Sequence, residues 1–294
     1  MLDQAERLRR MVKGESGLDE SNSKEQDPKT KIITVTSGKG GVGKSNFVVN
    51  IAIALQREGK KVLIFDADLG MGNDDVLMGI YPKYSVFDVI KGKDIEDIVI
   101  EGPEGVKLLP GGSGLNQIED LEQYERDEFL KKLESLLGFD YILMDTGAGI
   151  NKSVLAFMAC SDEVIILTTP EPTSLTDAYS LVKAADHFKI KNKAKVVVNK
   201  AFDLDEGKQT FNKFKMAVDR FLSVEVTYLG CILDDRKLVQ SVKDQKPVVI
   251  AHPYSDASKS INIICHNLLS EAIDDIHIKS TAKGLFKKIF NLFS

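Results

Sequence analysis

The stretch from Ser37 to Ser45 reads SGKGGVGKS and decides the fold. The residues before it, IITVT (32–36), form an apolar run typical of a buried strand, and an amphipathic helical pattern follows directly. In this strand–loop–helix context the stretch satisfies the phosphate-loop pattern GxxxxGK[ST]. Its glycines let the backbone fold around an anion, with successive N–H groups pointing inward. A glycine-rich turn would match such a short pattern by chance, but the flanking elements favour a nucleotide phosphate site.

The loop and the start of the helix are expected to bind the nucleotide. Lys44 is placed to reach the β- and γ-phosphates, and the Ser45 hydroxyl to ligate Mg²⁺. The positive end of the helix adds to the attraction for phosphate. The expected nucleotide-binding residues here are Gly38, Gly40, Gly41, Val42, Gly43, Lys44, Ser45 and Asn46.

Outward from the loop, short apolar runs alternate with longer amphipathic patterns. This alternation predicts one doubly wound, mostly parallel α/β sheet flanked by helices, spanning residues 31–275. Besides 32–36, strands are expected at 62–66, 106–109, 141–145, 164–168, 195–199 and 228–233. Helices are expected at 45–58, 125–137, 174–188, 208–222, 235–243 and 257–275.

Acidic residues end two of the expected strands. Asp66 and Asp68 close the run at 62–66, and Asp145 closes YILMD (141–145) before the small residues TGAG. The carboxyl ends of parallel strands form the ligand crevice of such sheets. Asp145 is expected to bind Mg²⁺ through water. Two acids spaced i and i+2 are suited to divide the work between metal-bound water and the attacking water, although strand-end acids also make ordinary turn hydrogen bonds.

Composition narrows the class of protein. The 294 residues are 43% hydrophobic and 28% charged, which excludes a largely disordered chain. The formal net charge of −5 argues against a surface devoted to nucleic acid. The three cysteines have no paired spacing, which favours a reducing cytoplasm. The charged N-terminus lacks a signal peptide, and no apolar run reaches the roughly 20 residues needed to cross a bilayer.

The run KGGVGKS (39–45) resembles the deviant phosphate loop of the MinD/ParA family of nucleotide-switch ATPases. The resemblance implies ATP rather than GTP, and a homodimer that encloses two nucleotides. Lys39 matches the family lysine that reaches the phosphates of the partner subunit. The matching acids imply that Asp66 lies near Mg²⁺ and that Asp68 activates water. A cation that arrives only on dimerisation would stabilise the transferring charge only in the dimer.

The sequence specifies the binding site of the nucleotide base less completely than the phosphate site. Asn199, at the end of the expected strand 195–199, matches the family asparagine that contacts adenine, and an amide can hydrogen-bond a base in two directions. The next loop, LDDR (233–236), lacks the proline found after this strand in many relatives, and Asn46 replaces a common threonine. Further base contacts therefore remain open.

The N-terminus suggests one branch of the family. DQAERLR (3–9) resembles the DQAxxLR segment of FlhG (YlxH or FleN), the MinD-like regulators of flagellar number and placement. There the segment forms a helix that stimulates the signal-recognition-type GTPase FlhF. Residues 1–13 are the expected partner-activating helix and 14–30 a flexible linker, with a merely fraying terminus as the alternative. The expected partner-binding residues are Asp3, Gln4 (the stimulating residue), Ala5, Leu8 and Arg9.

The C-terminal segment, residues 276–294, ends in KGLFKKIFNLFS (283–294). Its apolar side chains follow a helical stripe with lysines opposite, which favours a helix lying in an anionic membrane surface. The alternative is a last helix packed on the domain. One copy should bind reversibly and two copies much better. The expected membrane-binding residues are Leu285, Phe286, Lys287, Lys288, Ile289, Phe290 and Phe293.

Together these features predict a slow, dimerisation-dependent ATP hydrolase that uses Mg²⁺ and binds the inner face of the cell membrane peripherally. Lys39, Lys44 and Asp68 are the expected catalytic residues. The expected partners are a second copy, FlhF and anionic lipid, with flagellar switch components or a flagellar transcription regulator as further possibilities. Alternatives are a MinD-type division-site regulator, a ParA-like DNA-partition ATPase, a nucleotide-binding scaffold without turnover, and a metabolic P-loop kinase.

Overall fold

The computed structural model describes residues 30–68, 72–89, 91–111, 132 and 138–274. The expected N-terminal helix (1–13), the linker up to residue 29 and the segment 276–294 lie outside these residues, as does the expected helix 125–137 apart from Lys132. Thr30, the last residue of the expected linker, is already buried, and its hydroxyl donates to the carbonyl of Phe139 at 2.8 Å.

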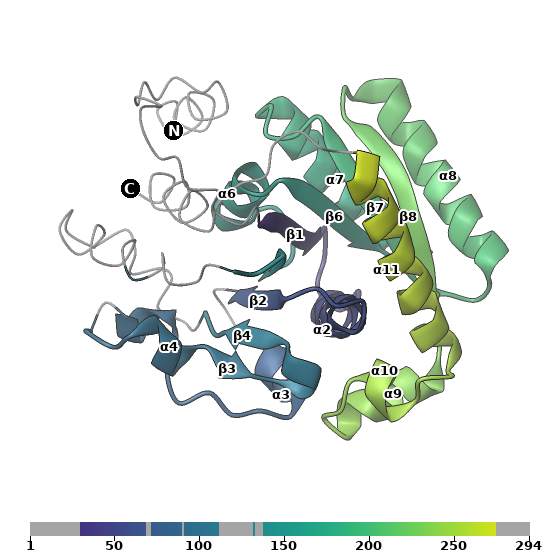
Figure 1. Cartoon of the computed structure of the whole chain (residues 1–294). Helices are drawn as coiled ribbons and strands as arrows, with labels where there is room; N and C mark the ends of the chain where they lie inside the picture. The colour runs from purple at the N-terminus through teal and green to yellow at the C-terminus, as the bar shows by residue number, and fades with distance from the viewer. Residues whose placement is uncertain (1–29, 69–71, 90, 112–131, 133–137, 275–294) are drawn as a thin grey trace.

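An eight-stranded sheet forms the centre of the molecule, in the order β3-β4-β2-β5-β1-β6-β7-β8 (Figure 1). All neighbouring strands are parallel except the edge pair β3 and β4. This arrangement confirms the predicted doubly wound, mostly parallel sheet and adds one antiparallel edge strand that the sequence did not predict. The strands are β1 (Lys31–Ser37), β2 (Val62–Ala67), β3 (Ile100–Glu101), β4 (Lys107–Leu109), β5 (Tyr141–Thr146), β6 (Glu163–Thr168), β7 (Lys193–Ala201) and β8 (Glu225–Leu233).

Helices and short helical turns connect the strands. Five of the six expected helices are present within a few residues of their predicted bounds; α3, α4, α6 and α10 were not predicted. Asn151 caps helix α6, since its side chain accepts a hydrogen bond from the Val154 N–H at 2.8 Å. The helices are α2 (Lys44–Arg57), α3 (Asp74–Met78), α4 (Ile95–Ile98), α6 (Lys152–Cys160), α7 (Pro172–His187), α8 (Leu204–Phe221), α9 (Arg236–Lys243), α10 (Val248–Ala251) and α11 (Asp256–Asp274), with 3₁₀ turns η1 (Val86–Val89) and η2 (Pro103–Gly105).

Alternate residues of the strands pack into cores on the two faces of the sheet. Ile33 and Val35 of β1 join a core with α2 and α11, whereas Ile32 joins a core with α6 on the other face. Helices α7 and α8 share a third core with β6, β7 and β8 (Figure 1). Strands covered on both faces are apolar throughout, which is why their sequences show little alternation. No helix in the described ranges has the length and apolar composition needed to traverse a bilayer.

The order of the central strands positions the functional groups. Strand β1 leads into the phosphate loop, and β5 and β2 lie next to it on one side. In the register, Val35 of β1 pairs with Asp145 of β5, which in turn pairs with Asp66 of β2. The carboxyl ends of three neighbouring strands therefore bring the loop and both acids to one edge of the sheet.

Candidate functional site

The phosphate loop joins β1 to α2 through backbone conformations that favour glycine. Gly41 and Gly43 have φ values of 79° and 91°, in the left-handed region. A Cβ atom at Gly43 would also lie 2.4 Å from Nδ2 of Asn199. The Phe47 N–H donates to the Gly43 carbonyl at 3.0 Å, so the helix starts immediately after the loop and directs its free N–H groups toward it.

Two residues at the end of β7 hold the outer edge of the loop. Asn199 Nδ2 donates to the Val42 carbonyl at 2.7 Å, and Lys200 Nζ donates to the Gly41 carbonyl at 2.9 Å. Asn199 Oδ1 accepts from the Lys200 N–H at 2.9 Å, so both ends of this amide bind the chain itself. The adenine contact expected of Asn199 stays a prediction. The sequence analysis did not identify Lys200 as a residue that holds the loop. The signal for it in the sequence is weak: a lysine that follows the asparagine at the end of the expected strand.

Inside the loop, Lys44 forms a buried ion pair with Asp145. Lys44 Nζ lies 2.7 Å from Asp145 Oδ1, and their side chains are 8% and 2% exposed. Burial raises the pKa of Asp145, while the positive charge of Lys44 and hydrogen bonds from Lys44 and the Ser45 hydroxyl oppose that rise. The structure thus brings together the expected phosphate-binding lysine and two expected Mg²⁺-site residues.

Asp66 lies beside this pair. Burial, followed by the negative charge of Asp145, raises the pKa of Asp66 to about 7, although the Asp68 N–H donates to its Oδ1 at 3.2 Å. No group of three His, Cys, Asp or Glu side chains among the described residues is arranged to hold a metal unaided. Mg²⁺ at nucleotide sites uses one or two carboxylates and is completed by phosphate and water. The hard oxygens of Ser45, Asp66 and Asp145 fit that kind of site.

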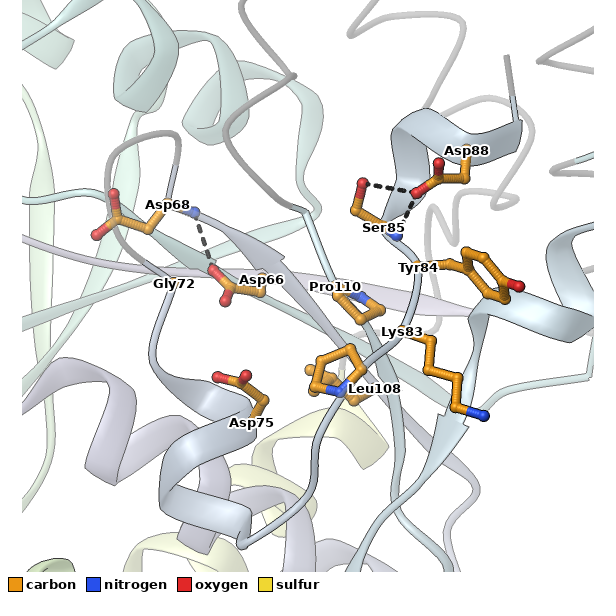
Figure 2. A pocket seen from close by; sticks show the side chains of 11 residues that line it. Asp66, Asp68, Gly72, Asp75, Lys83, Tyr84, Ser85, Asp88, Leu108 and Pro110 are labelled. Atoms are coloured by element: carbon orange, nitrogen blue, oxygen red, sulfur yellow. Dashed lines mark hydrogen bonds between the residues drawn. The ribbon is translucent and has the colours of Figure 1, made fainter. Parts of the chain in front are cut away.

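Asp68 lines three cavities. It lines the large cavity over the phosphate loop, a second cavity beside β4 and a third beside α6. Figure 2 shows the second, of about 320 Å³, with Asp66 and Asp68 at the end of β2, Asp75 on α3 and Lys83 across the opening. A carboxylate in this position has access to water on several sides, as a residue that handles the attacking water requires.

The large cavity, of about 690 Å³, extends from the phosphate loop to α9. The loop 233–236, left open by the sequence, contributes Asp234 and Asp235 to its wall. Helix α9 adds Leu238, Val239 and Val242, and Val239 is 51% exposed. Apolar side chains facing a polar phosphate cradle suit the flat face of a base. Their spacing of i, i+1 and i+4 in the expected helix 235–243 was the signal that could have identified them.

Lys39 projects away from this interior. Its Nζ lies 2.6 Å from Glu171 Oε2 and 3.0 Å from Thr173 Oγ1, at the start of α7. The hydrogen bond and charge of Lys39 lower the pKa of Glu171. The two lysines of the loop are therefore separated: Lys44 faces the nucleotide site of its own chain, and Lys39 lies at the surface of the molecule.

Comparison with known proteins agrees with this geometry. The family described as an AAA domain matches residues 30–198. The antiactivator FleN of Pseudomonas aeruginosa is 37% identical over 81% of this chain and 86% of its own length, and the flagellum site-determining protein YlxH of Helicobacter pylori is 38% identical over 82% and 83%. The MinC:MinD cell division complex of Aquifex aeolicus contains a chain with a TM-score of 0.66 and 28% identity, covering 85% of this chain and 99% of that one. The chain thus belongs to the MinD/ParA family of P-loop ATPases, in the branch that includes FleN and YlxH.

Proposed function

We propose that the protein is an ATP-dependent switch that regulates the number or placement of flagella. The observation that carries the proposal is the phosphate loop with Lys44 facing the Asp66–Asp145 pair, in a chain similar to FleN and YlxH over most of its length. ATP binds in the 690 Å³ cavity, its base against α9 and its phosphates in the loop.

Each residue of the site has a defined task in this switch. When the phosphates enter, Lys44 exchanges Asp145 for the β- and γ-phosphates, which frees the carboxylate to hold metal-bound water. Mg²⁺ supplies charge neutralisation at the phosphates, and Ser45, Asp66 and Asp145 are the residues that would hold it. Asp68 orients the attacking water, and the glycines after Thr146 allow that loop to move once the γ-phosphate has left.

Dimerisation couples nucleotide state to output. Two copies meet at the phosphate-loop face, where Lys39 leaves Glu171 and binds the phosphates of the other subunit. The charge of Lys39 then stabilises the transition state only in the dimer, so hydrolysis is slow in the monomer. Hydrolysis within the dimer limits the lifetime of the dimer. In the single chain Lys39 already lies at the surface, where exposed hydrogen bonds to Glu171 and Thr173 hold it.

Replacing Lys39 with alanine tests this coupling. With ATP, the wild type should double its mass in light scattering, whereas the Lys39→Ala variant should remain monomeric and hydrolyse ATP at least tenfold more slowly, since about 1.4 kcal/mol of lost stabilisation gives that factor. Lys183→Ala, an exposed lysine on α7, is the matched control and should behave as wild type. A wild-type mass that is the same without nucleotide, with ADP and with ATP contradicts the switch.

The two ends of the chain supply the proposed outputs. Residues 1–13 bind FlhF and stimulate its GTPase through Gln4, because a glutamine side chain can orient an attacking water. Residues 276–294 bind anionic lipid through their apolar stripe and lysines. The proposal also includes flagellar switch components or a flagellar transcription regulator as further partners.

Two truncations test these outputs and control for each other. A chain lacking residues 1–12 should lose stimulation of FlhF GTPase but still sediment with anionic liposomes in ATP. A chain ending at residue 279 should stimulate FlhF but no longer sediment. The full chain should sediment more with ATP than with ADP, because two membrane segments bind together. A full chain that does not stimulate FlhF GTPase would favour a MinD-type division-site regulator, and stimulation that survives loss of residues 1–12 would exclude this segment as its source.

A ParA-like DNA partition ATPase is the other candidate within the family. It requires a basic surface and binding that weakens steeply with salt. The formal net charge of −5 disfavours this function.

A further inference from the structure

Asp74 is a buried acid that the nucleotide switch described above leaves without a task. It is the first residue of α3, and its side chain is 0% exposed. No N–H or O–H group of the described residues donates a hydrogen bond to either of its carboxylate oxygens. Burying an acid without a donor is costly. A folded chain that nevertheless keeps one needs a ligand or a function to explain it.

The charged groups around Asp74 indicate what kind of ligand would bind there. Burial first, then the charges of Asp145 and Asp66, raises its pKa well above the ordinary range, and its carboxyl comes within hydrogen-bonding reach of Asp145. Lys44 is the cation that opposes this rise. Three buried carboxyl groups, when ionised, thus outnumber one buried ammonium group by two charges. A divalent cation with its water shell would balance that excess.

We propose that Asp74 is an outer-shell residue of the Mg²⁺ site, accepting a hydrogen bond from metal-bound water between Asp66 and Asp145. This inference rests on the proposed nucleotide function. Mg²⁺ dehydrates reluctantly and keeps several waters, which need acceptors behind the direct ligands. Outer-shell acceptors orient the ligands of a metal, and their loss lowers metal affinity by about 10- to 100-fold.

Within the part of the chain that the structure describes, no three acids form a preformed set of metal ligands, which agrees with an outer-shell role for Asp74. Asp74 lines none of the three cavities that Asp68 borders, whereas its neighbours Asn73 and Asp75 each line one. Asp74 is thus buried beside Asp145 and Asp66 and away from these cavities. This position suits a residue that acts on the water and carboxylates around the ion rather than on the phosphates.

The test compares Asp74→Asn with Asp75→Asn in the full chain. Asparagine has nearly the same shape as aspartate and removes the charge; Asp75 is the adjacent acid on the same helix and is only half-buried. Calorimetry would measure ADP binding in EDTA and then with MgCl₂ titrated into the ADP complex. Asp74→Asn should weaken Mg²⁺ binding about 10- to 100-fold, leave ADP affinity in EDTA within about twofold and keep or raise the melting temperature. Asp75→Asn should change Mg²⁺ affinity less than about threefold.

Four outcomes separate the possibilities. Unchanged Mg²⁺ affinity in Asp74→Asn overturns the inference, and so does an equal loss in Asp75→Asn, which would indicate a general field effect. An Asp74→Glu variant keeps the carboxylate and should recover part of the Mg²⁺ affinity that Asp74→Asn loses. If Asp74→Asn also melts below the wild type and Asp74→Glu recovers no Mg²⁺ affinity, the loss comes from a damaged fold and the inference is contradicted. A wild-type chain that binds no ADP refutes the proposed function instead.

Discussion

Replacing Lys44 with alanine should abolish ATP hydrolysis and lower the free energy of unfolding of the nucleotide-free protein by about 3–5 kcal/mol. Lys44 provides the buried positive charge beside Asp145, and both side chains are nearly inaccessible to water. Without it, Asp145 is left among the acids Asp66 and Asp74. Breaking a buried pair by removing one partner is costly because the other charge remains uncompensated. Urea unfolding at pH 8 without nucleotide measures the loss of stability, and phosphate release from ATP measures the loss of hydrolysis.

A double variant separates stability from binding. Lys44→Ala combined with Asp145→Asn removes the stranded charge, so it should recover most of the lost stability. It should not recover hydrolysis, because the phosphates still lack their lysine. A single Lys44→Ala variant that is as stable as the wild type would show that the ion pair contributes nothing to the nucleotide-free fold. A single variant that still hydrolyses ATP would exclude Lys44 from the phosphate site.

The parts of the site that depend on local sequence could be predicted. The loop 37–45 carries its own backbone requirements, and the strand-ending acids follow from where parallel strands end. The strand ends therefore predicted that Asp66 and Asp145 lie at the ligand crevice, and the family resemblance added their place near Mg²⁺. The register of β2 and β5 places the two acids side by side, and Lys44 lies 2.7 Å from Asp145. The central strands could also be predicted, because each is a continuous apolar run with polar or small residues at its ends.

The parts set by tertiary packing could not be predicted. In the sequence Asp74 is one of two adjacent acids, and only the packing of α3 against α2 shows that it is buried. The edge strand β3 is two residues long, too short to show a pattern. Helix α6 was missed because its apolar stretch follows directly on the TGAG loop. The spacing of the apolar side chains of α9 indicates an apolar helix face, but only the structure shows that this face lines the cavity.

The nucleotide-free protein should be more stable at pH 5 than at pH 8, and Asp66 should be a main cause. Its pKa is about 7 in the folded state against 3.8 as the ordinary value. Between these values the folded state binds more protons than the unfolded state, so the free energy of unfolding falls as pH rises. The loss ends just above pH 7 and, at about 1.4 kcal/mol per pH unit, amounts to about 3 kcal/mol between pH 5 and pH 8 for Asp66. Burial also raises the pKa of Asp145 and Asp74, which act in the same direction.

Urea unfolding in EDTA at pH 5, 6, 7 and 8 measures this dependence, with Asp66→Asn as the test variant. The amide resembles the protonated acid, so the variant should lose most of the slope and be the more stable protein at pH 8. Asp97→Asn, which removes an exposed acid, should keep the wild-type slope. Stability that instead rises from pH 5 to pH 8 in the wild type would contradict this prediction. It would mean that Asp66 is already ionised at pH 5 in the folded state without Mg²⁺, and that the acids at this sheet edge do not destabilise the nucleotide-free fold.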